Sequence, residues 1–193
     1  MIVLRYGNTN SYFLAGKSGG LLIDTDYAGT LPAFYKALKQ HGIRTDDIGY
    51  VLATHYHPDH MGLIGQLAQQ GAKLLLAECQ KDFVHSSDYI FNRDKLPFVP
   101  IDEEIDVVIS CRESRDFLLS LGIHGEIIST PSHSEDSISV ILDDGTCIVG
   151  DLEPPEYIDA YEDNPALKKD WEHILYYNPK RICYAHRPEQ NLV

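Results

Sequence analysis

The run Thr54-His55-Tyr56-His57-Pro58-Asp59-His60 places three histidines and an aspartate within six consecutive positions. Imidazole is the commonest protein ligand for metal ions near neutral pH, and a neighbouring carboxylate suits a divalent ion. Random order of the same residues would produce this pattern in about one chain in five hundred. The run therefore predicts a metal site, because neither core packing nor a solvated surface explains four strong ligands so close together.

The residues on either side of this run predict its place in the fold. Val51-Leu52-Ala53 is typical of the end of a buried strand, and the residues from Met61 to Leu67 have helical spacing. The ligands should therefore lie on a loop at the carboxyl end of a strand. Open α/β sheets place their functional sites there, which favours a catalytic metal site.

The same run resembles the signature His-x-His-x-Asp-His of the metallo-β-lactamase superfamily. Three later residues, each at the end of an apolar run, resemble the remaining ligands of that family: His133, Asp151 and His186. Their order and spacing agree with the family across nearly the whole chain. The resemblance implies an α/β (α+β) fold, a four-layered αββα sandwich of the metallo-β-lactamase type, with residues 1–193 as one domain.

The resemblance also implies two adjacent metal sites. The first would consist of His55, His57 and His133, with an open position for water. The second would consist of Asp59, His60 and His186, with Asp151 bridging the two metals. Two cations about 3.5–4 Å apart can hold a hydroxide between them and stabilise negative charge that develops on the substrate. Asp59 is the predicted catalytic residue, because it could both ligate a metal and orient that hydroxide or relay its proton.

The ligand types indicate which metals suit these sites. We expect two divalent ions and favour zinc, because the ligands are nitrogen and oxygen with no thiolate. Iron and manganese would accept the same ligand set. The chain departs from the family where glycine is common, at Ser132 and on either side of the final histidine, at Ala185 and Arg187. These departures bear on loop shape rather than on metal binding.

Other residues are weaker candidates for the site. Asp24 resembles a family aspartate that supports the metal loop by hydrogen bonding, although a turn-capping role explains it equally well. Arg112 and Arg115 could bind an anionic substrate, but a solvated helix start explains them better. Four tyrosines in predicted loops could donate a hydrogen bond to a substrate: Tyr27, Tyr56, Tyr157 and Tyr161.

Composition narrows the class of protein. The 193 residues carry a formal net charge of −13, and 44% of them are hydrophobic. The acidic balance and the lack of a Lys/Arg cluster argue against a nucleic-acid partner, although two metal ions would make the pocket locally positive. The four cysteines are far apart and are expected to be reduced. With no signal peptide and no membrane span in the sequence, we expect a cytoplasmic protein with a small-molecule substrate.

Apolar periodicity predicts the secondary structure. Strands are expected near residues 11–15, 20–24, 50–54, 73–77, 105–109, 126–130, 137–143, 146–150 and 181–184. Helices are expected near residues 30–41, 60–70, 115–121 and 166–177. The segment Cys79–Asp102 mixes aromatic and charged residues, which suggests an insertion that covers the pocket or forms a homodimer contact.

Comparison with branches of the resembled family refines the expected activity. Because the sequence ends soon after His186, we expect no C-terminal helical domain like that of the glyoxalase II branch. His57 stands where the flavodiiron branch has Glu, which argues against that redox chemistry. The leading hypothesis is a metal-dependent hydrolase of a small ester, thioester, lactone or related substrate. The alternatives are a metal-dependent phosphodiesterase or nuclease, and a redox enzyme with a single iron.

Overall fold

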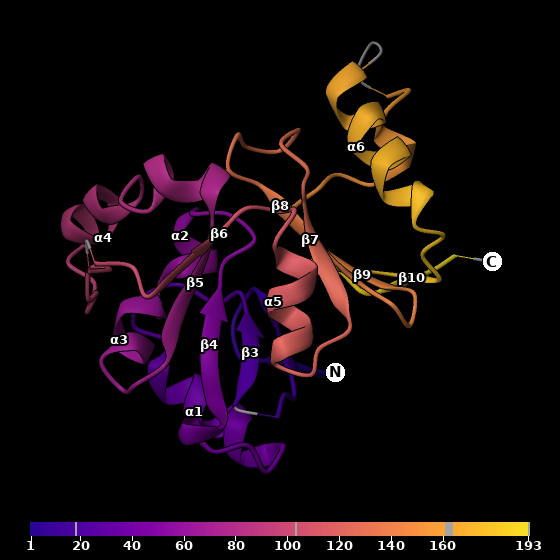
Figure 1. Ribbon diagram of the computed structural model, residues 1–193. Helices are drawn as coiled ribbons and strands as arrows, with labels where there is room; N and C mark the ends of the chain where they lie inside the picture. The colour runs from indigo at the N-terminus through magenta and orange to yellow at the C-terminus, as the bar shows by residue number, and fades with distance from the viewer. Residues whose placement is uncertain (18, 103, 161–163, 193) are drawn as a thin grey trace.

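Two β-sheets form the middle of the protein in the computed structural model, which describes residues 1–17, 19–102, 104–160 and 164–192 (Figure 1). Within these residues the first sheet has six strands, in the order β1 (Ile2–Arg5), β2 (Asn10–Leu14), β3 (Gly20–Ile23), β4 (Ile48–Leu52), β5 (Lys73–Ala77) and β6 (Val107–Ile109). Over the same residues the second sheet has five strands, in the order β11 (Gln190–Asn191), β10 (Arg181–Tyr184), β9 (Thr146–Gly150), β8 (Ile138–Leu142) and β7 (Gly125–Ser129).

Strand direction brings several carboxyl ends to the same edge of each sheet. In the first sheet β3, β4, β5 and β6 run parallel to one another. In the second sheet β9 and β10 are parallel, and β7 has the same direction because it and β9 both pair antiparallel with β8. The loops that follow these strands therefore leave from one edge, where ligand sites of open sheets usually lie.

Alternation along the strands divides the apolar side chains between two faces. In β5, Leu74 and Leu76 pack in one core, whereas Leu75 and Ala77 point into another core that also holds side chains of the second sheet. Ile148 of β9 is among those side chains. This period of two is the pattern expected of a sheet that is buried on both faces.

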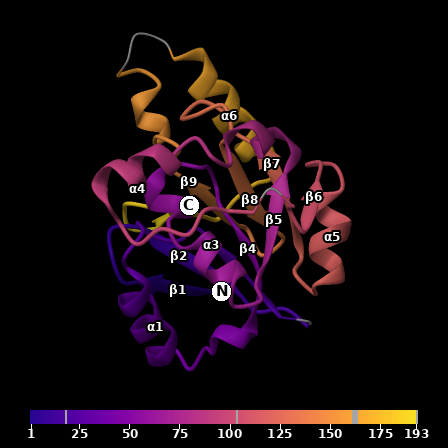
Figure 2. The same ribbon diagram turned by 90° about the vertical axis from the view of Figure 1, so that its left-hand side faces the viewer.

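Helices cover the outer face of each sheet (Figure 1 and Figure 2). Side chains of α1 (Leu31–Gln40) and α3 (Ile64–Ala68) share one apolar core with the first sheet. Side chains of α6 (Pro165–Tyr176) share another core with the second sheet. A shorter helix, α5 (Ser114–Ser120), contributes Leu118 to the core between the sheets. The order helix, sheet, sheet, helix confirms the predicted four-layered αββα sandwich.

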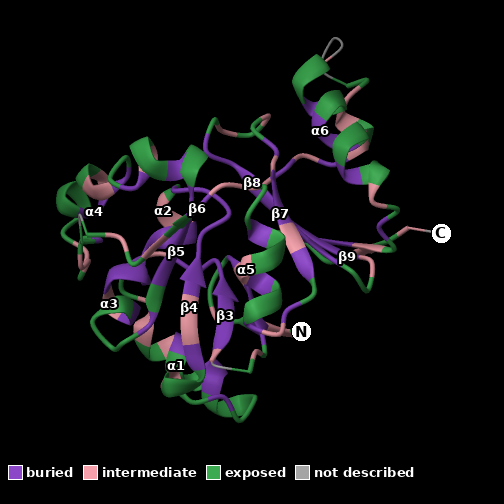
Figure 3. Cartoon of the chain, in the orientation of Figure 1, coloured by how far each residue is buried: buried purple, intermediate pink, exposed green. Residues whose placement is uncertain are grey.

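Burial follows these layers. In Figure 3 the strands are mostly buried, and the outward faces of the helices are exposed. Helix α6 buries Leu167, Trp171 and Ile174 and exposes Lys168 and Glu172, which is the amphipathic pattern of a surface helix. Among the described residues, no helix combines the length and the apolar character that crossing a membrane requires.

The predicted helix over residues 60–70 is divided in two. It forms α2 (Pro58–Met61) and α3 (Ile64–Ala68), separated at Gly62. A Cβ atom added at Gly62 would lie 2.3 Å from the backbone nitrogen of Ala28, so only glycine allows this close approach. The prediction of one continuous helix was wrong because a contact with a distant segment of the chain bends the backbone here.

Three elements were not predicted, namely β1, β11 and α4 (Asp88–Asp94). The described residues also form three short 3-10 helices that were not predicted: η1 (Thr45–Asp47), η2 (Glu78–Phe83) and η3 (Pro155–Tyr157). Helix α4 belongs to the segment Cys79–Asp102, in which Phe91 is buried and Tyr89 is exposed. Phe91 stacks on Phe98 with ring centroids 4.2 Å apart, and it meets Tyr27 edge to face. This segment is therefore anchored to the helical side of the first sheet.

Candidate metal centre

The residues predicted as metal ligands come together at the carboxyl ends of four strands. The run from His55 to His60 follows β4, and the other three residues follow β7, β9 and β10: His133, Asp151 and His186. Both sheets therefore contribute ligands to one centre. Two groups of neighbouring ligand atoms match those that the resemblance implied, and a third group joins Asp151 to His55 and His60.

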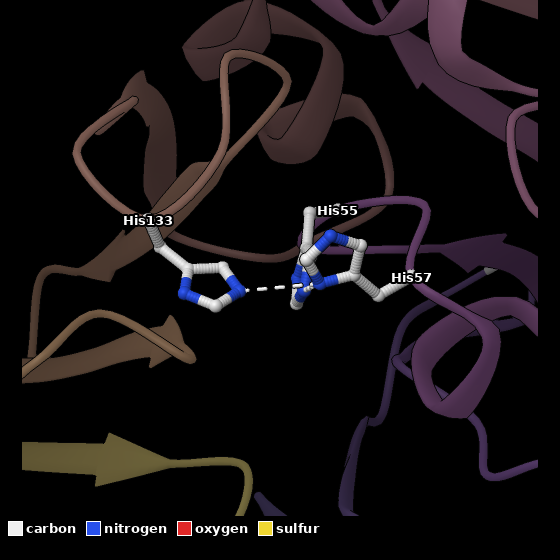
Figure 4. A group of neighbouring side chains, drawn as sticks. All are labelled: His55, His57 and His133. Atoms are coloured by element: carbon white, nitrogen blue, oxygen red, sulfur yellow. Dashed lines mark hydrogen bonds between the residues drawn. The ribbon is translucent and has the colours of Figure 1, made fainter.

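Three imidazoles converge on the first position (Figure 4). The Nδ1 atom of His57 lies 2.9 Å from Nε2 of His55 and 3.2 Å from Nε2 of His133. Two nitrogens bound to one tetrahedral zinc at about 2.0–2.1 Å would be about 3.3–3.4 Å apart, so the spacing suits a single ion. Burial lowers the pKa of His55 and of His133, so both rings are neutral near pH 7 and have a lone pair to offer.

The second position lies between Asp59, His60 and His186. The Oδ2 atom of Asp59 is 3.1 Å from Nε2 of His186, and its Oδ1 atom is 3.9 Å from Nε2 of His60. One ligand atom from each of these residues lies within 4.8 Å of the others. His60 is fully buried, whereas the side chain of His186 is 35% exposed, so this position also has an open side.

Asp151 lies between the two positions. Its Oδ1 atom is 3.4 Å from Nε2 of His60 and 3.3 Å from Nε2 of His186. Its Oδ2 atom is 3.8 Å from Nε2 of His133 and 4.0 Å from Nε2 of His55. Each carboxylate oxygen therefore faces one of the two positions. A carboxylate that bridges two metal ions needs this orientation.

Contacts with neighbouring residues orient the ligands of the second position. Asp24 accepts the backbone N–H of Thr54 at 2.6 Å, and its Oδ2 atom lies 3.1 Å from Nδ1 of His60. The Nδ1 atom of His186 donates to the carbonyl oxygen of Asn8 at 3.0 Å. In both histidines Nε2 is left facing the centre, as in metal sites where the other ring nitrogen is held by an outer partner. Of the two roles considered for Asp24, the structure supports the one that holds the ligand loop.

Charge at the second position favours a cation. Burial alone would lower the pKa of His60, but the carboxylates of Asp24 and Asp151 outweigh burial and raise it to about 10. The adjacent carboxylates of Asp151 and Asp59 raise the pKa of His186 to about 11. Although burial opposes its ionisation, Asp151 has a lowered pKa because His186 and His60 stabilise its charge. A divalent ion could replace the protons of these two histidines among the same carboxylates.

Two buried polar atoms test whether a metal fits. Among the described residues, Nε2 of His60 and Oδ1 of Asp151 are buried without a hydrogen-bond partner. Unsatisfied buried polar atoms are rare in native proteins, and an ion between these two atoms would satisfy both. The donor set of imidazoles and carboxylates also suits zinc or iron. The residues present therefore fit a metal centre.

Two residues that sequence reasoning did not identify hold the ligand loop in place. The side-chain amide of Gln80 donates to the carbonyl oxygens of Ala53 at 2.9 Å and of Asp136 at 3.2 Å. The carboxylate of Asp136 accepts the backbone N–H of Tyr56 at 2.6 Å. Gln80 and Asp136 are far from the loop in sequence and belong to no local motif, so no signal in the chain marked them.

A cavity of about 270 Å³ opens beside the centre. Three of its lining residues are predicted ligands, namely His133, Asp151 and His186. Apolar and aromatic residues form much of the remaining wall, among them Leu152, Pro154, Tyr157 and Tyr184. This volume is at the lower end of the range for small-molecule sites. Arg187 also lines the cavity, although its position suggested only an effect on loop shape.

The predicted hydrogen-bonding tyrosines differ in their placement. Tyr157 lines the cavity, as a substrate contact requires. Tyr56 is only 1% exposed and its hydroxyl is buried, so it is not placed to contact a substrate. Tyr27 packs against Phe91 in the segment Cys79–Asp102. Tyr161 lies outside the described residues.

The remaining weak candidates lie elsewhere. Arg115 forms ion pairs with Glu126 and Asp143, which leaves its charge engaged away from the centre. The segment Cys79–Asp102 lines a separate hollow of about 360 Å³ that also reaches His57. The segment therefore borders the open side of the three-histidine position, and its role as a homodimer contact stays a prediction.

Comparison with protein families and curated proteins gives a consistent result. A family model described as the metallo-beta-lactamase superfamily matches residues 4–186. The "Beta-lactamase-like protein 2 homolog" of Drosophila melanogaster is 28% identical over 181 residues, which cover 92% of this chain and 58% of that protein. The chain thus spans little more than half the length of that relative.

Solved structures share the fold at low sequence identity. A metallo-beta-lactamase family protein of Thermus thermophilus, TTHA1429, matches with a TM-score of 0.75 and 20% identity, over 98% of this chain and 74% of that chain. TTHA1623, solved in a di-iron-bound form, matches with a TM-score of 0.72 and 19% identity, over 98% of this chain and 93% of that chain. These similarities support the αββα fold.

Proposed function

Because the chain belongs to the metallo-beta-lactamase superfamily, whose members are mostly metal-dependent hydrolases, we propose that it uses two divalent metal ions to hydrolyse a small ester, thioester or lactone. The proposed ligands of the first ion are His55, His57 and His133. Those of the second ion are Asp59, His60 and His186, and Asp151 would be shared between the two ions.

The orientation of Asp151 is the observation that carries this proposal. A carboxylate that ligated a single ion would be expected to face one group of imidazoles. Instead, Oδ1 and Oδ2 of Asp151 face separate groups of imidazoles, at 3.3–3.4 Å and 3.8–4.0 Å. Both groups have a side open to solvent, which a catalytic site needs and a structural site lacks.

The residues around the centre would have different roles in the reaction. Two divalent ions held here would lower the pKa of a bound water to about 7 and stabilise negative charge that develops on the substrate. The hydrogen bond from His186 keeps the pKa of Asp59 low despite burial, so its carboxylate is ionised and can orient the attacking water. The wall formed by Leu152, Pro154 and Tyr157 would hold the apolar part of the substrate beside the centre.

The identity of the metal is a separate part of the proposal. Zinc is our first choice, because it favours nitrogen and oxygen ligands with an open coordination position. Iron is the second choice, since the structurally similar TTHA1623 has been solved in a di-iron-bound form. Manganese also accepts these ligands.

Hydrolysis assays on the metal-loaded protein test the proposed activity. The substrates are an ester, a thioester and a lactone with chromogenic or titratable products. We expect the Asp59→Ala variant to lose at least about 100-fold in kcat, because an orienting group is worth about this much. The surface variant Asp46→Ala serves as the control and should keep full activity. Full activity of Asp59→Ala would remove Asp59 from the mechanism.

The assays also separate the two alternative activities. Hydrolysis of a phosphodiester dye without hydrolysis of the three acyl substrates would favour a phosphodiesterase. A single iron per chain, with colour in the purified protein, would favour a redox enzyme. Either result would replace the hydrolase proposal.

A further inference from the structure

Arg187 lies on the wall of the cavity that opens beside the proposed metal centre. It follows directly after His186, and both residues line the cavity of about 270 Å³ together with Asp151. The guanidinium group of Arg187 lies over the ring of Tyr184, 5.5 Å from its centroid. This cation–π contact holds the side chain against the wall.

Hydrogen bonds fix the backbone on which Arg187 sits. The side-chain amide of Asn10 donates to the carbonyl oxygens of Tyr184 at 3.0 Å and of Arg187 at 3.1 Å. The same amide therefore ties the end of β10 to β2 of the other sheet. Because the backbone of Arg187 is fixed, less conformational freedom is lost when its guanidinium group binds a ligand, which favours binding.

A second hollow of about 240 Å³ adjoins the first one at His186 and Arg187. Its other lining residues are Arg5, Asn8, Asn10 and Pro188. No carboxylate belongs to this lining among the described residues. The hollow therefore combines two cations with amide groups, which is unusual in a chain with a formal net charge of −13.

The charges of Arg5 and Arg187 are not neutralised by ion pairs within the described part of the chain. Four other arginines pair with carboxylates within 4.0 Å: Arg44, Arg93, Arg115 and Arg181. For Arg5 and Arg187, the described residues offer no such pair. Two such cations at the mouth of an active site are suited to an anionic group of the substrate.

Glu153 adds a negatively charged side chain to the lining of the cavity. It lines the same cavity as Arg187, and it also lines a hollow on the other side that includes Ser132 and His133. An anionic group would be repelled at the Glu153 end and attracted at the Arg187 end. A bound substrate should therefore place its anion on the His186 side of the centre.

We propose that Arg187, assisted by Arg5, binds a carboxylate or phosphate group of the substrate, so that the preferred substrates are anionic acyl compounds. This inference rests on the proposed hydrolase function. It adds the chemical class of the substrate and a residue that determines specificity.

A matched pair of substrates tests this inference. The 4-nitrophenyl monoester of glutarate carries a terminal carboxylate, and 4-nitrophenyl pentanoate is a neutral ester of similar length. We expect the wild-type protein to prefer the anionic ester in kcat/KM. Arg187→Gln should lower the ratio of the two kcat/KM values by about 10- to 100-fold, as expected for a lost hydrogen bond to a charged group. Arg187→Lys should retain part of the preference, because it keeps the charge without the bidentate geometry.

The control variant is Arg44→Gln, which removes the same charge from an exposed ion pair away from the centre. It should leave the ratio unchanged. Equal ratios in wild type and Arg187→Gln, or a wild type that prefers the neutral ester, would overturn the inference. Replacing the glutarate ester by an ester with a phosphate group then tells which anion is preferred.

Direct binding separates this inference from the proposed function. Binding of glutarate and of inorganic phosphate to the metal-loaded protein is measured by calorimetry in wild type and in Arg187→Gln. If no ester is hydrolysed, the proposed function fails, and the binding result alone decides whether Arg187 belongs to an anion site. An affinity at least 10-fold lower in Arg187→Gln supports the anion site, and equal affinities refute it.

Discussion

At the scale of single residues, the candidate ligands and the supporting Asp24 could be predicted, whereas the other supports could not. The run from His55 to His60 is a local pattern, and His133, Asp151 and His186 follow it in the order of the family. Gln80 and Asp136 hold the ligand loop through contacts between distant parts of the chain. Arg187 lines the cavity because of the path of its loop, and a loop path is not encoded in a short motif.

Asp24 should control metal affinity without being a ligand. It fixes the ligand loop through Thr54 and meets Nδ1 of His60 at 3.1 Å. Asp24→Asn keeps the size of the side chain but removes its charge, and we expect metal affinity to fall by about 10- to 100-fold. Competition with a chromogenic chelator measures this affinity. Asp46→Asn is the control, and an unchanged affinity in Asp24→Asn would contradict the assigned role.

Metal loading should release protons. His60 and His186 have pKa values raised to about 10 and about 11, so both are protonated near pH 7.5 in the metal-free protein. Ligation removes these protons, so metal affinity should rise with pH. Calorimetric titration in two buffers of different ionisation enthalpy should give a release of about two protons per chain. If no protons were released, metal binding would not displace protons from these histidines.

The raised pKa values of His60 and His186 also determine how the stability of the metal-free protein depends on pH. A histidine with a raised pKa stabilises the fold fully below its unfolded pKa of about 6.5, and that contribution is lost as pH rises through the folded pKa. The metal-free protein should therefore lose stability between about pH 6.5 and the pKa of His60, about 10. Thermal unfolding across this range checks the sign.

At the scale of elements, periodicity located the central strands and the long helices. It missed β1 and β11, which are short and lie at the sheet edges, and it missed α4, which buries only Phe91. β1 and β11 pair with β2 and β10, their neighbours in the chain, and are too short to show a periodic pattern of their own. Periodicity also gave no sign of the backbone shape at the end of β9. Gly150 there has a positive φ of 58° and lies against Thr54.

Substituting Gly150 tests how closely β9 must approach the ligand loop. A Cβ at this position would lie 2.4 Å from Oγ1 of Thr54, which also hydrogen-bonds to Asp24. Gly150→Ala should destabilise the protein by about 2–4 kcal/mol, from backbone strain and displacement of Thr54. Gly42→Ala is the control, because Gly42 has a positive φ of 69° but no atom within 4 Å of the added Cβ. Equal losses of Tm in the two variants would show that contact with Thr54 is unimportant.

At the scale of the whole molecule, the candidate centre joins the two sheets. The loop after β4 and the adjoining helix α2 supply four of the proposed ligands, and residues after strands of the second sheet supply the others, His133, Asp151 and His186. Direct hydrogen bonds also connect the sheets nearby, such as those from Ile138 N to Thr54 O at 2.9 Å and from Tyr12 Oη to Tyr184 O at 2.7 Å. Bound metal should add a further link between the two sheets.

Metal removal should lower the stability of the whole protein. A ligand at 1,000 times its Kd stabilises the native state by about 4 kcal/mol, so removal by a chelator should lower Tm by several degrees. Adding the metal back should restore Tm. A Tm that does not respond to chelator or metal would contradict a centre that joins the sheets.

The most direct test of the dinuclear centre is the metal content of the purified protein. Elemental analysis should be made on protein prepared without chelators and without a histidine tag. The orientation of Asp151 between two ligand groups predicts about two zinc, iron or manganese ions per chain. The variant His133→Ala should retain about one. A single ion in the wild type, or no metal even after reconstitution, would contradict the dinuclear centre.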